Sequence, residues 1–306
     1  MIPDATMTLD LVDIGANLTH DSFDQDRDEV LARARAAGVR QMVLTGSTVP
    51  ESHAAAALAA AHAGELYATA GIHPHHAREL DAGSIPALRG IAAAPQVVAI
   101  GECGLDYYRN FSPHEDQERA FAAQLELACE LGMPAFLHQR DAHERFVAIL
   151  REHRPRLVRA VAHCFTGTAA ELDDYLALDL HIGITGWICD ERRGLHLREL
   201  VKRVPVERLM LETDAPYLSP PGAPRRNEPR WVEITARWVA DSRVSSIREP
   251  RRGSVPRSGT SMRKLSALKV TRMPASAATW RSASSRLALR RLSVIRISGS
   301  FAASSR

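Results

Sequence analysis

Several features that would place this chain in a common class are missing from its sequence. It contains no run of about 18 apolar residues, and its first residues, MIPDATM, include neither a basic nor an apolar stretch. We therefore expect no membrane segment, no secretory leader and a cytoplasmic location. The four cysteines form no CxxC pair, so neither a disulfide framework nor a zinc ribbon is indicated. No GxGxxG or GxxxxGK[ST] motif follows the first apolar run, which weighs against dinucleotide-binding and P-loop proteins.

Acidic residues are almost absent from the last part of the chain. Residues 243–306 carry 15 Lys and Arg against the single acid Glu249, a net charge of +14, whereas residues 1–242 have a net charge of −11. This last segment is rich in Ser, Arg and Ala and has no histidine. We expect residues 9–242 to form the folded domain. Residues 243–306 are expected to be a basic tail, either disordered or translated out of frame.

An apolar run followed by a helical stretch repeats eight times within the acidic part. The runs that predict strands are residues 10–14, 41–45, 66–72, 97–101, 133–137, 158–162, 180–184 and 208–213. Helical spacing connects them, for example over 24–37, 51–63, 114–131 and 192–203. Eight such units predict an α/β fold, a TIM-type (β/α)8 barrel, in preference to an open doubly wound sheet. We expect the eighth helix and the C-terminal closure of the barrel to be incomplete, because the alternation stops near Ser242.

Metal-binding residue types stand at the ends of five predicted strands. They are His73, Glu102, His138, His163 and Asp214. The active site of a TIM barrel lies at the C-terminal ends of its strands, so these side chains are expected to meet. Carboxylate and imidazole ligands without thiolates suit Mg²⁺, Mn²⁺ or Zn²⁺, and the carboxylates favour the harder ions.

This ligand set predicts hydrolysis of a phosphodiester. Two ions bridged by a carboxylate would produce a hydroxide nucleophile and hold both oxygens of an in-line displacement. Glu102, on a central strand, is the candidate bridge. Asp214 would bind a metal and receive the proton of the attacking water. We therefore predict a divalent metal cofactor, with two ions to a site, and the ligand chemistry alone does not choose among Mg²⁺, Mn²⁺ and Zn²⁺.

Seven motifs around these residues point to one family. They read DIGANL (13–18), GIHPHHA (71–77), GECGLDYY (101–108), PAFLHQRDA (134–142), HCFTG (163–167), LETDAPYLSP (211–220) and RRNEP (225–229). In this order and spacing the chain resembles the TatD family of deoxyribonucleases. The resemblance implies metal ligation by Glu102, His138, His163 and Asp214, with His73 at the active site. It also implies metal-dependent hydrolysis of DNA from the 3′ end, with DNA as the substrate and no obligate protein partner.

The first motif departs from the pattern of several members of the wider family. Those members carry an HxH pair after the first strand, where this chain has Gly15 and Asn17. The departure leaves fewer protein ligands for the more exposed metal position. It favours a weakly held second ion completed by water and substrate, as is usual for Mg²⁺.

Four further residues are candidates for binding the substrate. Arg140 is expected to hold a phosphate, and Arg225, Arg226 and Asn227 are expected to fix the scissile phosphate or its neighbour. The alternatives are a solvated loop ion pair and a charged helix entrance. Tyr107, Tyr108 and Phe111 either stack a terminal base or pack the loop after the fourth strand.

Three other functions remain open. A small-molecule amidohydrolase shares the barrel, but many such enzymes bridge their metals with a modified lysine, and residues 1–242 contain only Lys202, on a predicted outer helix. A hydrolase of an ester bond in tRNA fits the same ligands. The third is a non-catalytic protein that binds nucleic acid through the basic tail, with steeply salt-dependent affinity.

Overall fold

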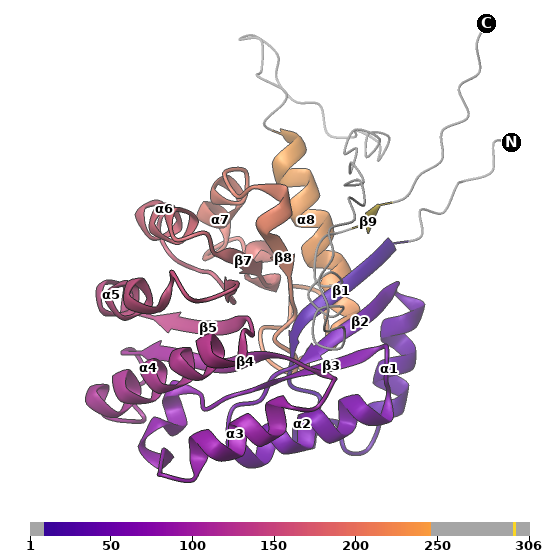
Figure 1. Ribbon diagram of the computed structural model, residues 1–306. Helices are drawn as coiled ribbons and strands as arrows, with labels where there is room; N and C mark the ends of the chain where they lie inside the picture. Colours follow the sequence, from indigo (N-terminus) through magenta and orange to yellow (C-terminus); the bar gives the residue numbers. More distant parts are fainter. Residues whose placement is uncertain (1–8, 246–295, 298–306) are drawn as a thin grey trace, which may run out of the picture.

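The computed structural model describes residues 9–245 and 296–297, in which strands alternate with helices (Figure 1). The strands are β1 (Leu9–Ala16), β2 (Val39–Leu44), β3 (Leu66–Ala70), β4 (Val97–Asp106), β5 (Ala135–Arg140), β6 (Ala160–Ala162), β7 (His181–Ile184), β8 (Leu209–Leu211) and β9 (Arg296–Ile297). The α-helices are α1 (Arg27–Ala36), α2 (Val49–Ala61), α3 (Ser84–Ala92), α4 (His114–Leu131), α5 (His143–His153), α6 (Ala169–Ala177), α7 (Leu195–Leu200) and α8 (Val232–Ser245). Short 3-10 helices are η1 (Asp21–Phe23), η2 (Pro74–Glu79), η3 (Gly186–Cys189), η4 (Val206–Arg208) and η5 (Pro229–Trp231).

The first eight strands follow one another around the sheet in chain order, each parallel to its neighbours. Just beyond β8 the chain returns to β1. The Asp214 amide donates to the Gly15 carbonyl at 2.8 Å, and the Asn17 amide donates to the Ala215 carbonyl at 2.7 Å. These bonds join the first and last strands, and the predicted TIM-type barrel is confirmed. On the side of β1 away from β2, β9 pairs with the start of β1 in the antiparallel direction.

The strands separate two apolar regions. The larger one lies between the strands and the surrounding helices and includes Ala135 and Leu137 of β5. The smaller one contains Ile14, Ala99, Phe136 and Val161, from four different strands. Successive side chains of a strand point to opposite faces, so Phe136 faces the barrel interior and Leu137 faces the helices. By the same alternation, the next inward-facing residue of β5 is His138.

Strand β4 departs from this alternation at the point where the site is built. Ile100 and Cys103 both belong to the outer apolar region although they are three residues apart, and the pairing with β5 is irregular between them. The extra residue turns Glu102 inward. The two glycines of the GECG motif permit this path: a Cβ on Gly101 would lie 2.2 Å from the Phe136 carbonyl oxygen, and one on Gly104 would lie 1.8 Å from that of His138.

Helix α8 extends past the predicted domain boundary at residue 242. Its 14 residues run from Val232 to Ser245, and the Arg243 guanidinium donates to the carbonyls of Val201 and Val204 at 2.6 and 2.7 Å. The start of the predicted tail is therefore part of the barrel. Apart from residues 243–245 and the two residues of β9, the predicted tail lies outside the described residues.

Candidate active site

The five predicted ligand residues all lie at the C-terminal ends of strands. His73 follows β3, Glu102 lies in β4, His138 lies in β5, His163 follows β6 and Asp214 follows β8. His73, Glu102 and His163 are each less than one tenth exposed. Parallel strands in a barrel end at the same rim, which is why residues up to 141 positions apart in the sequence share one site.

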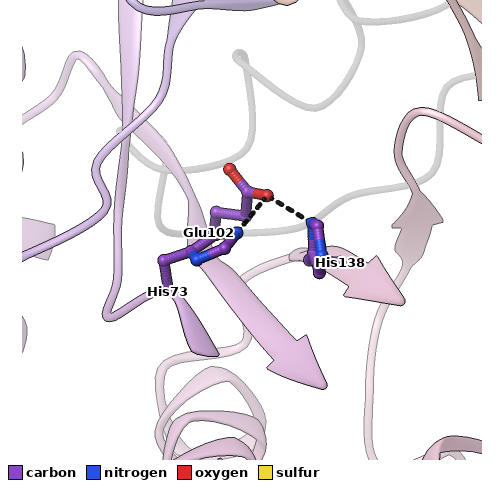
Figure 2. Close-up of side chains that lie close together, drawn as sticks. All are labelled: His73, Glu102 and His138. Carbon is purple, nitrogen blue, oxygen red and sulfur yellow. Dashed lines mark hydrogen bonds and ion pairs between the residues drawn. The ribbon is translucent and has the colours of Figure 1, made fainter. Parts of the chain in front are cut away.

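One carboxylate oxygen is the centre of the cluster. Oε1 of Glu102 lies 2.7 Å from His163 Nε2, 2.9 Å from His138 Nδ1 and 3.2 Å from His73 Nε2. Figure 2 shows Glu102 reaching between His73 and His138, with its second oxygen directed away from both rings. Of the five predicted residues, the structure therefore gathers four in direct contact.

The charges within the cluster are strongly coupled. Although burial acts against it, His163 and His73 hold the pKa of the Glu102 carboxyl well below its usual range. Burial also opposes ionisation of His163, but Glu102 and Glu212 raise its pKa well above the usual value. Burial lowers the pKa of His73 to about 4, so this imidazole is neutral at pH 7.

Asp214 stands beside the cluster without a hydrogen bond to it among those the described residues make. Its carboxylate accepts from Asn17 Nδ2 at 3.2 Å, and its backbone has a positive φ of 55°. Burial, reinforced by the charges of Glu102 and Glu212, raises the pKa of Asp214 to about 7, while His163 acts in the opposite direction. A carboxyl group with a pKa near neutrality is suited to exchanging protons at physiological pH.

Two carboxylates that the sequence reasoning did not place in the ligand set support its histidines. Glu212 is fully buried, its Oε2 lies 3.4 Å from His163 Nδ1, and its other oxygen accepts from the Cys164 amide. Asp106 lies 2.8 Å from His75 Nε2 and 3.4 Å from His138 Nε2. Asp106 also accepts from the amides of Tyr108 and Arg109, so it caps the turn after β4 as well.

The donor set fits a divalent metal ion. His73, Glu102 and His138 each offer a ligand atom within 4.8 Å of the others. Ligands about 2.1 Å from an ion lie up to about 4.2 Å apart, so small side-chain movements would complete the coordination. His138 Nε2 is buried and makes no hydrogen bond within the described part of the chain, despite its proximity to Asp106.

The predicted substrate-binding residues divide into two pairs. Arg140, on β5, places its guanidinium carbon 4.0 Å over the Tyr108 ring and has no carboxylate partner within residues 9–245. Arg225 is exposed and also forms no ion pair with the described residues. Both guanidinium groups therefore retain donors for a phosphate.

The other pair, also expected to bind phosphate, is engaged inside the protein. Arg226 donates to the two carboxylate oxygens of Asp26 at 2.7 Å each, and also to Glu228 at 3.1 Å. Asn227 is buried and donates to the carbonyls of Thr213 and Tyr217 at 2.9 and 2.6 Å. Their donors hold the loop that follows β8. The charged helix entrance, weighed above as the alternative, describes their surroundings better.

Fold and cluster together define a (β/α)8 barrel with a histidine and carboxylate centre at the C-terminal rim. The chain belongs to the TatD family: the model of TatD related DNase matches residues 12–252. A Pantoea protein (strain At-9b) named 3′-5′ ssDNA/RNA exonuclease TatD is 55% identical over 235 residues, which are 75% of this chain and 90% of that protein. A Klebsiella pneumoniae protein of the same name is 55% identical over 76% of this chain and 90% of its own length.

Solved structures agree with this assignment. The TatD homologue YjjV from Escherichia coli K12 superposes with a TM-score of 0.71 at 28% identity, covering 80% of this chain and 93% of that one. A hydrolase of the TatD family from Entamoeba histolytica gives a TM-score of 0.69 at 27% identity, covering 78% and 93%. The family resemblance drawn from the motifs is thus confirmed. Within the described residues, none of the helices combines the length and the apolar character needed to span a membrane.

Proposed function

We propose that this protein hydrolyses phosphodiester bonds of single-stranded DNA from the 3′ end, using divalent metal ions. The observation that carries the proposal is the convergence of three imidazoles on one oxygen of Glu102, at the catalytic rim of a barrel of the TatD family. The names of the relatives, which are 52–55% identical, support the direction of cleavage and the class of substrate.

The proposed metal ligands are the predicted set. Glu102, His138, His163 and Asp214 would hold the metal, with His73 completing the site beside Glu102. We expect two ions, with Mg²⁺ ahead of Mn²⁺ and Zn²⁺ because carboxylate oxygen is a hard ligand. When bound, such ions acidify a water molecule and stabilise the negative charge that develops on the phosphate.

The protein's own groups bind the substrate and accept the proton of the attacking water. Asp214 receives the proton of the attacking water, a role that suits a carboxyl whose pKa burial raises to about 7. Arg140 and Arg225 neutralise phosphates of the bound strand, because neither forms an ion pair with the described residues. Glu212 and Asp106 keep the rings of His163 and His138 in place.

The amidohydrolase alternative has little support from the site. The only lysine between residues 9 and 245 is Lys202, which follows α7 and pairs with Glu199 at 2.6 Å on the outside of the barrel. It is therefore not available to bridge metals at a strand end. RNA remains a candidate substrate beside DNA, since the relatives' names include both.

The proposal is tested with chelator-treated protein and 5′-labelled oligonucleotides of DNA and RNA, single-stranded and duplex. We expect a ladder that shortens from the 3′ end of single-stranded DNA when Mg²⁺ or Mn²⁺ is restored, and none in the presence of EDTA. A 3′-blocked oligonucleotide is the matched control for direction. Full activity in EDTA, or no cleavage of any substrate with any of the three metals, would contradict the proposal.

A further inference from the structure

Aromatic side chains stand exposed on two sides of the Glu102 cluster. Within residues 10–244 the exposed large hydrophobic residues include Tyr108 (58%), Phe111 (51%) and Tyr217 (51%). The first two lie in the loop after β4, and Tyr217 lies in the loop after β8. Strands β4 and β8 are four positions apart in the order of an eight-stranded barrel, so their loops rise on opposite sides of the rim.

The loop after β4, which carries Tyr108 and Phe111, contacts the Glu102 cluster through Asp106 and His75. The Tyr108 amide donates to Asp106 Oδ1 at 3.1 Å, and the other oxygen of Asp106 lies 3.4 Å from His138. The Phe111 ring centroid is 4.7 Å from that of His75. Tyr107, the neighbour of Tyr108, is not a candidate for binding a base. Its hydroxyl donates to Glu118 at 2.8 Å, so this ring packs the loop.

Arg140 gives the Tyr108 ring a cationic partner. It is two residues beyond His138 on β5, and its guanidinium lies 4.0 Å over the ring. Because Arg140 forms no ion pair with the described residues, its donors face no competing carboxylate there. An aromatic ring with an adjacent guanidinium provides a stacking face for a base and donors for the neighbouring phosphate.

Tyr217, on the opposite side of the rim, is positioned by the loop that contains Asp214. The Tyr217 amide donates to the Asp214 carbonyl at 2.9 Å, and the Tyr217 carbonyl accepts from Asn227 Nδ2 at 2.6 Å. Its ring makes an edge contact with His20, the two centroids being 5.8 Å apart. The backbone is thus fixed beside the site, while the residue remains about half exposed to solvent and so open to a ligand.

Resting on the proposed function, we propose that Tyr108, backed by Arg140, and Tyr217 are base-stacking residues that hold the last two nucleotides of the strand, one on each side of the Glu102 cluster. Every base has a π-face, so this binding tolerates any sequence. Bases inside a duplex have both faces covered by their neighbours. Stacking on two separate rings therefore selects single-stranded ends. The preference for single-stranded over duplex DNA would thus come from Tyr108 and Tyr217.

The test combines protein variants with a change in the substrate. The variants are Tyr108→Ala and Tyr217→Ala, each beside its Phe counterpart, with Val158→Ala as a control because Val158 is exposed (48%) and precedes β6, at the opposite end of the barrel. Each is assayed on a single-stranded oligonucleotide and on the same strand with abasic sites at its last two positions. Thermal unfolding verifies that every variant is folded.

We expect either Ala variant to lower kcat/KM on the ordinary strand about tenfold, mainly through KM, as loss of one stacked base predicts. The Phe variants and Val158→Ala should match the wild type. On the abasic strand the Ala variants and the wild type should be equal, because no base remains to stack. An equal loss on both strands, or a Phe variant as impaired as its Ala counterpart, would overturn the inference.

The outcome remains separable from that of the proposed function. If the wild type cleaves neither strand, the proposed function fails. Stacking is then tested by the fluorescence anisotropy of the same two oligonucleotides, each carrying a fluorescent label, as they bind the protein in EDTA. In that measurement the Ala variants should bind the ordinary strand about tenfold more weakly and the abasic strand as the wild type does. Unchanged binding of the ordinary strand would overturn the inference by itself.

Discussion

Replacing Glu102 by Gln tests the metal centre with a readout that does not depend on catalysis. The amide keeps the size of the side chain but removes the charge from the oxygen that contacts His73, His138 and His163 at 2.7–3.2 Å. A metal at one hundred times its Kd stabilises a single-site protein by about 2.7 kcal/mol. In a domain of this size about 1 kcal/mol shifts Tm by roughly 2–4 °C, so the wild type should gain about 5–10 °C.

In the Glu102→Gln variant this metal-dependent gain should vanish, and turnover should fall by several orders of magnitude, because a central ligand is lost. Differential scanning fluorimetry over a series of Mg²⁺ and Mn²⁺ concentrations measures the shift. Glu130→Gln is the matched control, since Glu130 is exposed and pairs with Arg89 on the outer surface. If Glu102→Gln kept the thermal shift of the wild type, the metal would bind elsewhere and the assignment of Glu102 would be refuted.

Three further predictions concern protons, glycine and the tail. Metal binding should release protons and the metal Kd should fall from pH 6 to pH 8, because burial raises the pKa of Asp214 to about 7 and a ligand must be deprotonated; a pH-independent Kd by calorimetry would contradict this. Gly104→Ala should yield little folded protein, since the added Cβ would lie 1.8 Å from the His138 carbonyl oxygen, whereas Gly90→Ala, in open space within α3, should be neutral or stabilising by up to about 1 kcal/mol in thermal unfolding. Deleting residues 246–306 should preserve kcat on a short oligonucleotide and raise KM for long DNA only at low salt; loss of turnover in a deletion variant with an unchanged circular dichroism spectrum would show that these residues belong to the active structure.

The sequence alone was sufficient for the eight strands of the barrel and for the rim, but not for the end of α8, which runs to Ser245 past the predicted boundary at residue 242. The predicted helix over 114–131 is α4 to the residue, and its end at a glycine with φ of 60° follows a local rule. The eight predicted strands are all present, because the alternation of apolar runs and helical stretches reports burial directly. Ligand types at strand ends could be located in the same way, since the fold class determines where parallel strands terminate.

Some site residues were accessible to the sequence but were passed over. Glu212 stands two positions after Met210 of β8, which packs against the smaller, inner apolar region, and side chains at i and i+2 of an extended chain share a face. That spacing was the signal that Glu212 points toward the centre, where it contacts His163. Asn17 stands where other members carry the HxH pair, but its bond to Asp214 had no signal in the sequence, because that partner is 197 positions away.

Only the tertiary structure decided which polar groups are already satisfied. Arg225 and Arg226 are neighbours of the same type, yet Arg226 meets Asp26, 200 positions earlier in the chain, whereas Arg225 faces solvent. The inward turn of Glu102 likewise depends on how β4 pairs with β5. Local sequence determined which elements form and which residue types stand at their ends, because propensity and periodicity act over a few residues. The partners of Arg226 and Glu102 depended on contacts between distant segments, which exist only once the barrel has closed.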